Sequence, residues 1–172
     1  MVFLEIDTDN PSLIKELNDY LVEPNNKVFI LYYMVGCSPC AQTRPEWAKL
    51  QNVLPSNGLD KSDIIVASVN QELSSKLKVG KSPSAFPTMR FITENGKVIE
   101  NYEDATFFGE KDRTIDSFVK WIKSKEQVLM QNKKRTQKKK YKTQKGGYKK
   151  RKSASQKNKR NNKSRKNNKL KK

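Results

Sequence analysis

Two cysteines, Cys37 and Cys40, are the residues of this chain best suited to chemistry, and two residues separate them. Two thiols at this spacing can exchange a disulfide with a substrate or supply half of a zinc site. A structural zinc needs four ligands, usually Cys or His, and this chain has two cysteines and no histidine. Only carboxylates or a second chain could complete such a site, so we predict no metal and no other cofactor. An inert, buried cysteine pair is the remaining alternative.

The segments around the cysteines predict how the two thiols differ. The apolar run 28–34 is continuous and has strand length, which indicates a strand buried on both faces. The cysteines follow at once, and 41–54 can be helical. The free N–H groups and the dipole of a helix N-terminus stabilise a thiolate. We therefore expect Cys37 to be the exposed nucleophile and Cys40 the shielded, resolving thiol, held in a turn formed by Gly36, Ser38 and Pro39.

The remaining pattern of the first 130 residues predicts alternating strands and helices. We expect strands over 2–6, 28–34, 63–69, 88–93 and 97–102, and helices over 11–23, 41–54, 71–77 and from 114 onward. Helices between buried strands indicate parallel pairing, with helices on both faces of the sheet. The turn signal Glu94-Asn-Gly96 adds an antiparallel hairpin. The predicted fold class is α/β, with a central mixed β-sheet.

Several of these features together resemble thioredoxin and the catalytic domains of protein disulfide isomerase, over about residues 1–125. The resemblance rests on a strand followed by Cys-Ser-Pro-Cys, on Pro45 five residues later, and on Ala85-Phe-Pro-Thr88, which is similar to the family's cis-proline loop. It implies a thioredoxin-like fold and a thiol–disulfide oxidoreductase acting on protein disulfides. It also implies that Pro87 is cis, and that the loop lies against the cysteine pair and positions the substrate chain through Phe86, Pro87 and Thr88.

The stretch from Phe108 to Trp121 resembles the disulfide isomerase domains more than bacterial thioredoxin. By this resemblance Arg113 swings toward the active site and favours the thiolate of Cys40; the alternative is an ordinary surface arginine. Two positions depart from the family pattern: Gly36 stands where a tryptophan is usual, and Leu31 where a buried acid is usual. Without that acid we expect slower deprotonation of Cys40.

The positive charge of the chain lies at its C-terminal end. Of the 36 Lys and Arg residues 21 lie between 131 and 172, together with none of the 18 acidic residues. The first 130 residues therefore carry 15 basic and 18 acidic residues, a net charge of −3. A segment with almost no apolar side chains cannot offset its ordering entropy by burial. We predict a folded domain over 1–127 and a disordered tail over 128–172.

Dense basic clusters in this tail predict binding to nucleic acid or another polyanion through counterion release. The candidate residues are Lys149, Lys150, Arg151 and Lys152, and this cluster also resembles a nuclear localisation signal. A solvated extension without a partner is the alternative. A second hypothesis for the whole chain follows: a non-catalytic thioredoxin-fold scaffold whose tail binds nucleic acid in packaging or localisation.

The beginning of the chain lacks the basic and apolar regions of a signal peptide, and no run reaches the roughly 18 apolar residues of a membrane span. We therefore expect a cytoplasmic or nuclear monomer without membrane attachment. The tail, rich in Lys and Asn, resembles the tails of proteins from large DNA viruses. If the chain is viral, the virion is a further expected location.

Overall fold

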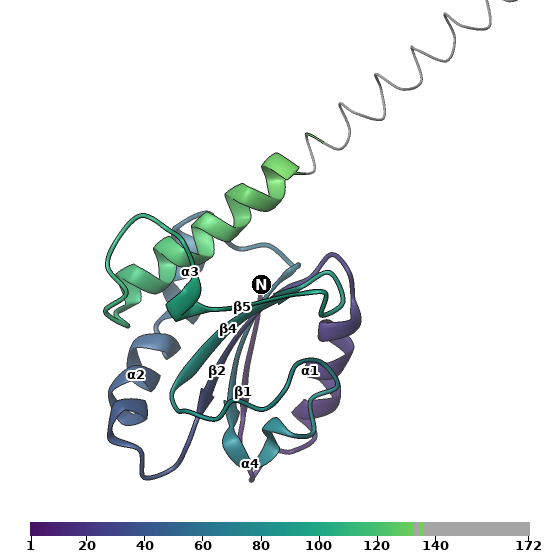
Figure 1. Ribbon diagram of the computed structural model, residues 1–172, viewed down its shortest axis with the longest axis vertical. Helices are drawn as coiled ribbons and strands as arrows, with labels where there is room; N and C mark the ends of the chain where they lie inside the picture. Colours follow the sequence, from purple (N-terminus) through teal and green to yellow (C-terminus); the bar gives the residue numbers. More distant parts are fainter. Residues whose placement is uncertain (133–134, 136–172) are drawn as a thin grey trace, which may run out of the picture. The chain divides into compact units, whose positions relative to one another are not determined.

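The computed structural model describes residues 1–132 and 135, and the sheet and the helices that connect its strands lie within Met1–Lys125. At the centre is one five-stranded sheet in the order β1-β3-β2-β4-β5 (Figure 1). The strands are β1 Val2–Ile6, β2 Lys27–Tyr33, β3 Ile64–Asn70, β4 Thr88–Thr93 and β5 Val98–Asn101. Both β1 and β2 pair parallel with β3, whereas β4 is antiparallel to β2 and to β5. The predicted mixed sheet with a hairpin at one edge is confirmed.

Helices connect the strands as the pattern predicts. They are α1 Leu13–Val22, α2 Ser38–Ala48, α3 Leu50–Ser56 and α4 Gln71–Ser74, followed by the short 3₁₀ helix η1 Tyr102–Asp104. The single helix expected over 41–54 begins earlier and is interrupted at Lys49. The backbone hydrogen bond at that point, from Lys49 N to the Pro45 carbonyl, is long at 3.4 Å. Pro45 lies inside α2 and cannot donate a hydrogen bond to the turn before it.

The two faces of the sheet carry different cores, because successive side chains of β2 point to opposite faces. One face is mostly aliphatic, with Tyr32 as its one buried aromatic member, and packs against α1 (Figure 1). The other face is aromatic: the ring of Phe29 lies 4.9 Å from that of Phe91 and 5.2 Å from that of Trp121. Helices therefore cover both faces, as predicted.

The aromatic face fixes the helix that carries the cysteines. Trp47 of α2 is fully buried, and its ring meets that of Phe118 edge to face at 5.0 Å. Tyr102 contacts Phe118 at 5.4 Å and Trp121 at 5.1 Å, and its hydroxyl donates to Ser117 at 2.8 Å. Edge-to-face pairs of this kind add stabilisation beyond the buried area. The orientation of α2 against the sheet is therefore set by side chains far away in the sequence.

The last helix begins at 115 and continues through 132 within the described residues. The domain boundary predicted between 127 and 128 therefore falls inside a helix, and 128–132 are helical rather than irregular. The other residues of the predicted tail, apart from Arg135, lie outside the part of the chain that the structure describes.

Candidate active site

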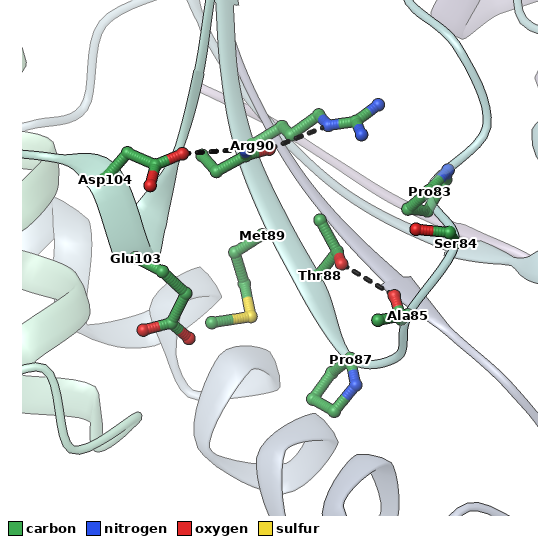
Figure 2. Close-up of a pocket in the computed structure, with 10 residues that line it drawn as sticks. Pro83, Ser84, Ala85, Pro87, Thr88, Met89, Arg90, Glu103 and Asp104 are labelled. Carbon is green, nitrogen blue, oxygen red and sulfur yellow. Dashed lines mark hydrogen bonds between the residues drawn. The ribbon is translucent and has the colours of Figure 1, made fainter.

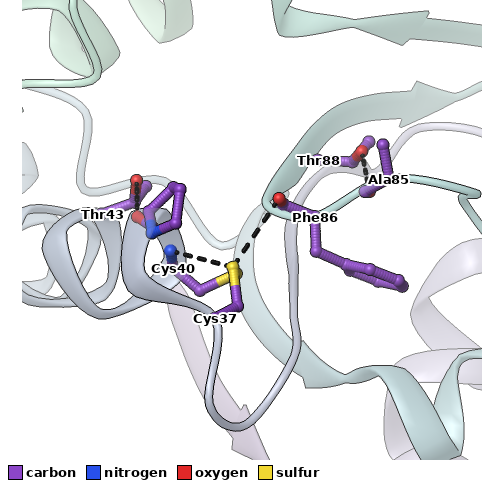
Figure 3. Close-up of a disulfide and its surroundings, with 7 residues drawn as sticks. Cys37, Cys40, Thr43, Ala85, Phe86 and Thr88 are labelled. Carbon is purple, nitrogen blue, oxygen red and sulfur yellow. Dashed lines mark hydrogen bonds between the residues drawn. A yellow bond between two sulfur atoms is a disulfide. The ribbon is translucent and has the colours of Figure 1, made fainter.

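Cys37 and Cys40 lie where β2 ends and α2 begins, and they form a disulfide with their Cα atoms 5.2 Å apart (Figure 3). Cys37 is the N-cap residue of α2, and its sulfur accepts a hydrogen bond from the Cys40 amide at 3.2 Å. Cys37 is partly exposed, whereas Cys40 is 1% exposed. In the reduced protein this amide and the helix N-terminus stabilise negative charge on the Cys37 sulfur.

The turn between strand and helix depends on three small or rigid residues. Gly36 has φ +78°, a conformation that favours glycine, and the space around its Cα is open. Backbone geometry therefore disfavours a side chain at this position, including the tryptophan of the family pattern. Ser38 and Pro39 are exposed in the first turn of α2. The hydroxyl of Thr43 donates to the Pro39 carbonyl at 2.9 Å and holds this turn.

The loop before β4 faces the disulfide. The Phe86–Pro87 peptide bond is cis, and the Phe86 carbonyl oxygen lies 3.7 Å from the Cys37 sulfur (Figure 3). The ring of Phe86 points away from the sulfurs and packs against the aliphatic core. The hydroxyl of Thr88 donates to the Ala85 carbonyl at 2.7 Å, which closes the loop on itself. Residues 49 positions apart thus present a sulfur and a backbone carbonyl to the same space.

Two shallow hollows adjoin these groups. The first, of about 300 Å³, lies beside the disulfide and is lined by Met34, Val35, Gly36, Cys37, Ser38, Cys40, Ala41 and Arg44; we call it the disulfide groove. The second, of about 240 Å³, lies beside the cis-proline loop (Figure 2). Its lining includes Pro87, Thr88 and two carboxylates, Glu103 and Asp104.

Comparison with family models shows which protein family this chain belongs to. The model of the Thioredoxin family matches residues 11–124. The chain belongs to the thioredoxin family. This result confirms the resemblance inferred from the cysteine and proline motifs.

Relatives are similar to this thioredoxin-family chain at modest identity. Protein disulfide isomerase-like 2-1 of Oryza sativa subsp. japonica is 26% identical over 125 residues, which cover 73% of this chain and 29% of the relative. Protein disulfide-isomerase of Datisca glomerata is 27% identical over 108 residues, covering 59% and 18% respectively. The chain therefore spans less than a third of the length of these relatives. Among solved structures, the Trx4 domain of ERdj5 matches with 14% identity and a TM-score of 0.47, covering 74% of this chain and 98% of that one.

Arg113, the residue expected to swing toward the cysteines, is held elsewhere in this thioredoxin-family site. Its Nη2 and Nε donate to one carboxylate oxygen of Glu103 at 2.8 and 3.2 Å, and its backbone has φ +60°. Glu103 lines the hollow beside Pro87. Arg113 must therefore leave Glu103 before it can act on Cys40, and its role stays a prediction.

Leu31 occupies the position where the thioredoxin family usually has a buried acid. It is fully buried in the middle of β2, between Ser68 of β3 and Met89 of β4. A buried leucine at this position offers Cys40 no carboxylate that could accept its proton. The slow deprotonation inferred from it stays a prediction.

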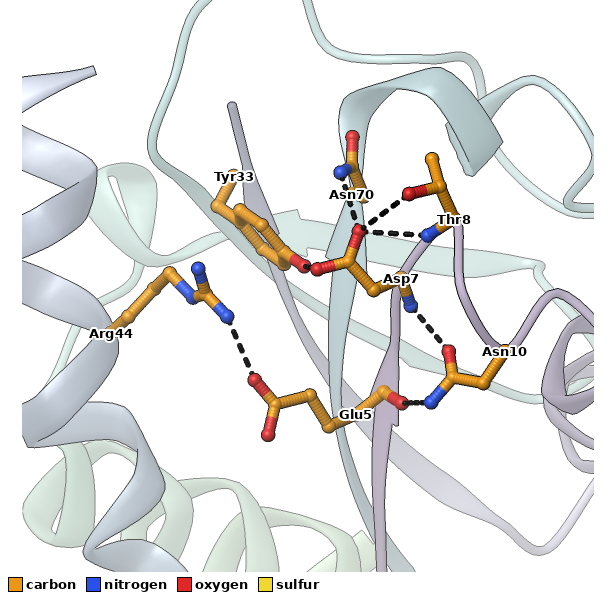
Figure 4. Close-up of polar contacts among 7 residues, drawn as sticks. All are labelled: Glu5, Asp7, Thr8, Asn10, Tyr33, Arg44 and Asn70. Atoms are coloured by element: carbon orange, nitrogen blue, oxygen red, sulfur yellow. Dashed lines mark hydrogen bonds and ion pairs between the residues drawn. The ribbon is translucent and has the colours of Figure 1, made fainter. Parts of the chain in front are cut away.

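A polar network at the carboxyl ends of β1, β2 and β3 was not predicted (Figure 4). Asp7 accepts hydrogen bonds from the Tyr33 hydroxyl at 2.8 Å and from the Asn70 side chain at 2.8 Å. The hydrogen bond from Tyr33 is the main reason that the pKa of Asp7 is lowered. Burial, with this bond second, raises the pKa of Tyr33. The available signal was that polar residues end three neighbouring parallel strands, whose carboxyl ends meet at one edge.

Arg44 joins this network to the disulfide groove and was also missed. Its guanidinium lies 3.9 Å from the centre of the Tyr33 ring, and its Nη2 donates to Glu5 at 2.8 Å. Arg44 follows Cys40 by four residues on α2, a spacing that puts both on one helix face. That spacing was the sequence signal for a charged group beside the cysteines.

Other predictions concern features outside this site. Within residues 1–132 and 135, no group of three or more His, Cys, Asp or Glu could hold a metal ion. No helix in the same residues is long and apolar enough to cross a membrane. The candidate polyanion-binding residues Lys149, Lys150, Arg151 and Lys152 lie outside the described residues.

Proposed function

We propose that this thioredoxin-family domain is a protein-disulfide oxidoreductase, in which Cys37 attacks and Cys40 resolves. One observation carries the proposal. The Cys37 sulfur caps α2, accepts the Cys40 amide at 3.2 Å and lies 3.7 Å from the carbonyl of a cis-proline loop. An inert structural pair needs neither the partial exposure of Cys37 nor a facing loop. The alternative of a purely non-catalytic scaffold therefore leaves this arrangement unexplained.

The reaction follows from the two thiols. In the reduced protein, the Cys37 thiolate attacks one sulfur of a substrate disulfide, and the other substrate sulfur leaves as a thiolate that takes up a proton. The Cys40 thiol then loses its proton and attacks the Cys37 sulfur. The Cys37–Cys40 disulfide forms, and the second substrate sulfur is released. Two electrons pass to the substrate, and the Cys37–Cys40 disulfide of the structure corresponds to the oxidised product of this sequence.

The cis-proline loop supplies the surface nearest to the reacting sulfur. The Phe86 carbonyl, adjacent to Cys37, is an acceptor that a substrate backbone N–H can use, and Thr88 begins β4 directly afterwards. We propose that Phe86, Pro87 and Thr88 align the substrate chain so that its disulfide meets Cys37 in line.

The test is reduction of insulin disulfides by the purified chain with dithiothreitol as electron donor. We expect Cys37→Ser to lower the rate to the uncatalysed level, because the nucleophile is lost. Cys40→Ser should still attack, and should accumulate a mixed disulfide visible by mass spectrometry. Full activity of Cys37→Ser would refute the proposal.

The direction of net transfer depends on the reduction potential of the Cys37/Cys40 couple relative to the potentials of its substrate and electron donor. Pro39 is typical of reductases in this family, whereas the isomerases and oxidants usually have His at this position. We therefore expect a potential closer to roughly −270 mV than to roughly −180 mV, measured by equilibration with glutathione.

A further inference from the structure

Arg44 is a charged residue in the wall of the disulfide groove that the proposed reaction does not use. It lines the groove together with both cysteines, one helical turn beyond Cys40. Its side chain is 38% exposed, so solvent and solutes reach part of it. The rest of the groove wall is apolar or small, with Met34, Val35 and Ala41 among its members.

Two contacts hold the Arg44 guanidinium in place. It stacks on the ring of Tyr33 at 3.9 Å, and that ring is fully buried and anchored through its hydroxyl to Asp7. Its Nη2 donates to Glu5 at 2.8 Å. A guanidinium has five N–H donors in a rigid fork, so one bond to Glu5 leaves donors for a second carboxylate. Because stacking already orders the side chain, binding an anion costs little further conformational entropy.

Glu5 is the present carboxylate partner, and its side chain is 58% exposed on the edge strand β1. A pair this exposed gains little from its own attraction. The Glu5 carboxylate can therefore share or yield the guanidinium when another carboxylate enters the groove.

We propose that Arg44 is a specificity-determining residue that binds a carboxylate of the substrate. The disulfide groove then selects disulfides flanked by an acidic side chain, with the carboxylate on Arg44 while Cys37 attacks the sulfur. This inference rests on the proposed oxidoreductase function. The competing explanation is that the pair only tethers β1 to α2.

The experiment uses three small aliphatic disulfides of similar size as probes: anionic 3,3′-dithiodipropionate, neutral bis(2-hydroxyethyl) disulfide and cationic cystamine. Rate constants for oxidation of the reduced full-length protein are measured by stopped flow at pH 7 and low salt. The quantity compared is the anionic rate divided by the neutral rate for each variant. Any effect of Arg44 on the reactivity of Cys37 itself acts on all three probes and cancels in this ratio.

We expect Arg44→Gln to lower the anionic-to-neutral ratio about three- to fivefold, the size of a partly exposed ion pair, and to raise the cationic-to-neutral ratio. Arg44→Lys keeps the charge and should retain most of the anionic preference. Glu5→Gln removes the competing carboxylate and should raise the ratio, but not when Arg44→Gln is also present. In roughly 0.5 M salt these differences should shrink, because exposed charges are screened.

The outcomes separate this inference from the proposed function. If the wild-type protein reacts with all three probes and Arg44→Gln and Glu5→Gln leave the ratios unchanged, the substrate-binding role of Arg44 is refuted while the oxidoreductase stands. If the wild-type protein reacts with none of them faster than Cys37→Ser does, the oxidoreductase proposal fails first.

Discussion

Two backbone groups near the Cys37 sulfur have opposite effects on its protonation. The Cys40 amide, 3.2 Å from that sulfur, favours the thiolate, whereas the Phe86 carbonyl at 3.7 Å can accept a hydrogen bond only from the thiol. In the proposed reaction, a substrate N–H that hydrogen-bonds to the Phe86 carbonyl would remove this acceptor from the Cys37 thiol and so favour the thiolate. The loop proposed to position the substrate would then also help to activate the nucleophile.

At the same scale, Tyr33→Phe tests the hydrogen bond that links β2 to Asp7. We expect a loss of about 1 kcal/mol in the free energy of unfolding at pH 7, because one hydroxyl donor to a carboxylate is removed. In the folded protein the pKa of Asp7 lies below its ordinary value of 3.8, chiefly because of this hydrogen bond. The stabilisation is therefore present above the ordinary value and is lost as the pH falls through the lower, folded-state pKa.

Urea denaturation of both proteins between pH 7 and pH 2 measures this difference. The difference in the free energy of unfolding between wild type and Tyr33→Phe should be constant at neutral pH and should decrease below about pH 4. Asp7→Asn, which removes the charge, should show the same narrowing. A difference that is equally large at pH 2 would contradict the assignment of the effect to the Asp7 carboxylate.

At the scale of elements, the position of α2 depends on contacts with the last helix. Trp47 of α2 packs on Phe118, and both are fully buried. The cysteines lie at the opposite end of α2 from Trp47. The aromatic cluster therefore acts as the anchor of the helix that positions the redox pair.

Phe118→Ala tests this anchor. We expect it to lower the free energy of unfolding by about 3–5 kcal/mol, because it leaves a cavity where the last helix packs against α2. Phe108→Ala is the matched control: Phe108 is 97% exposed, so its loss should change stability by less than about 0.5 kcal/mol. Urea denaturation at pH 7 measures the stability of both variants. A similar loss of unfolding free energy in both would show that the aromatic cluster contributes no more to stability than an exposed phenylalanine does.

At the scale of the whole molecule, the charge is divided unequally along the chain. The first 130 residues carry a net charge of −3, whereas the full chain carries +18. Such a chain combines a weakly acidic domain with a strongly basic extension. Any affinity for polyanions should therefore belong to the extension and depend steeply on salt.

A chain that ends at Met130 tests this division. We expect the full-length protein to be retained on immobilised nucleic acid at low salt and released as salt rises, while the shortened chain is not retained. The reduction of bis(2-hydroxyethyl) disulfide should be similar for both, because the described site residues all precede Met130. Equal retention of the two proteins would exclude the tail as the polyanion-binding segment.

The sequence by itself determined the features that local rules govern. The continuous apolar runs predicted the buried strands, and the spacing of Cys37 and Cys40 after a strand predicted a sulfur at a helix N-terminus. The motif resemblance pointed to the loop around Pro87. Each of these predictions needed only neighbours within one element or a short motif of adjacent residues.

Only the tertiary structure decided which distant charges meet. Arg113 pairs with Glu103 instead of approaching the cysteines, and Arg44 reaches Glu5 across 39 residues. Such pairs depend on which strands become neighbours and how the helices lie on them, and exposed charges follow no periodicity that reveals a partner. The order of apolar residues determines which side chains are buried. Which charged residues pair depends on which strands and helices become neighbours in the folded protein.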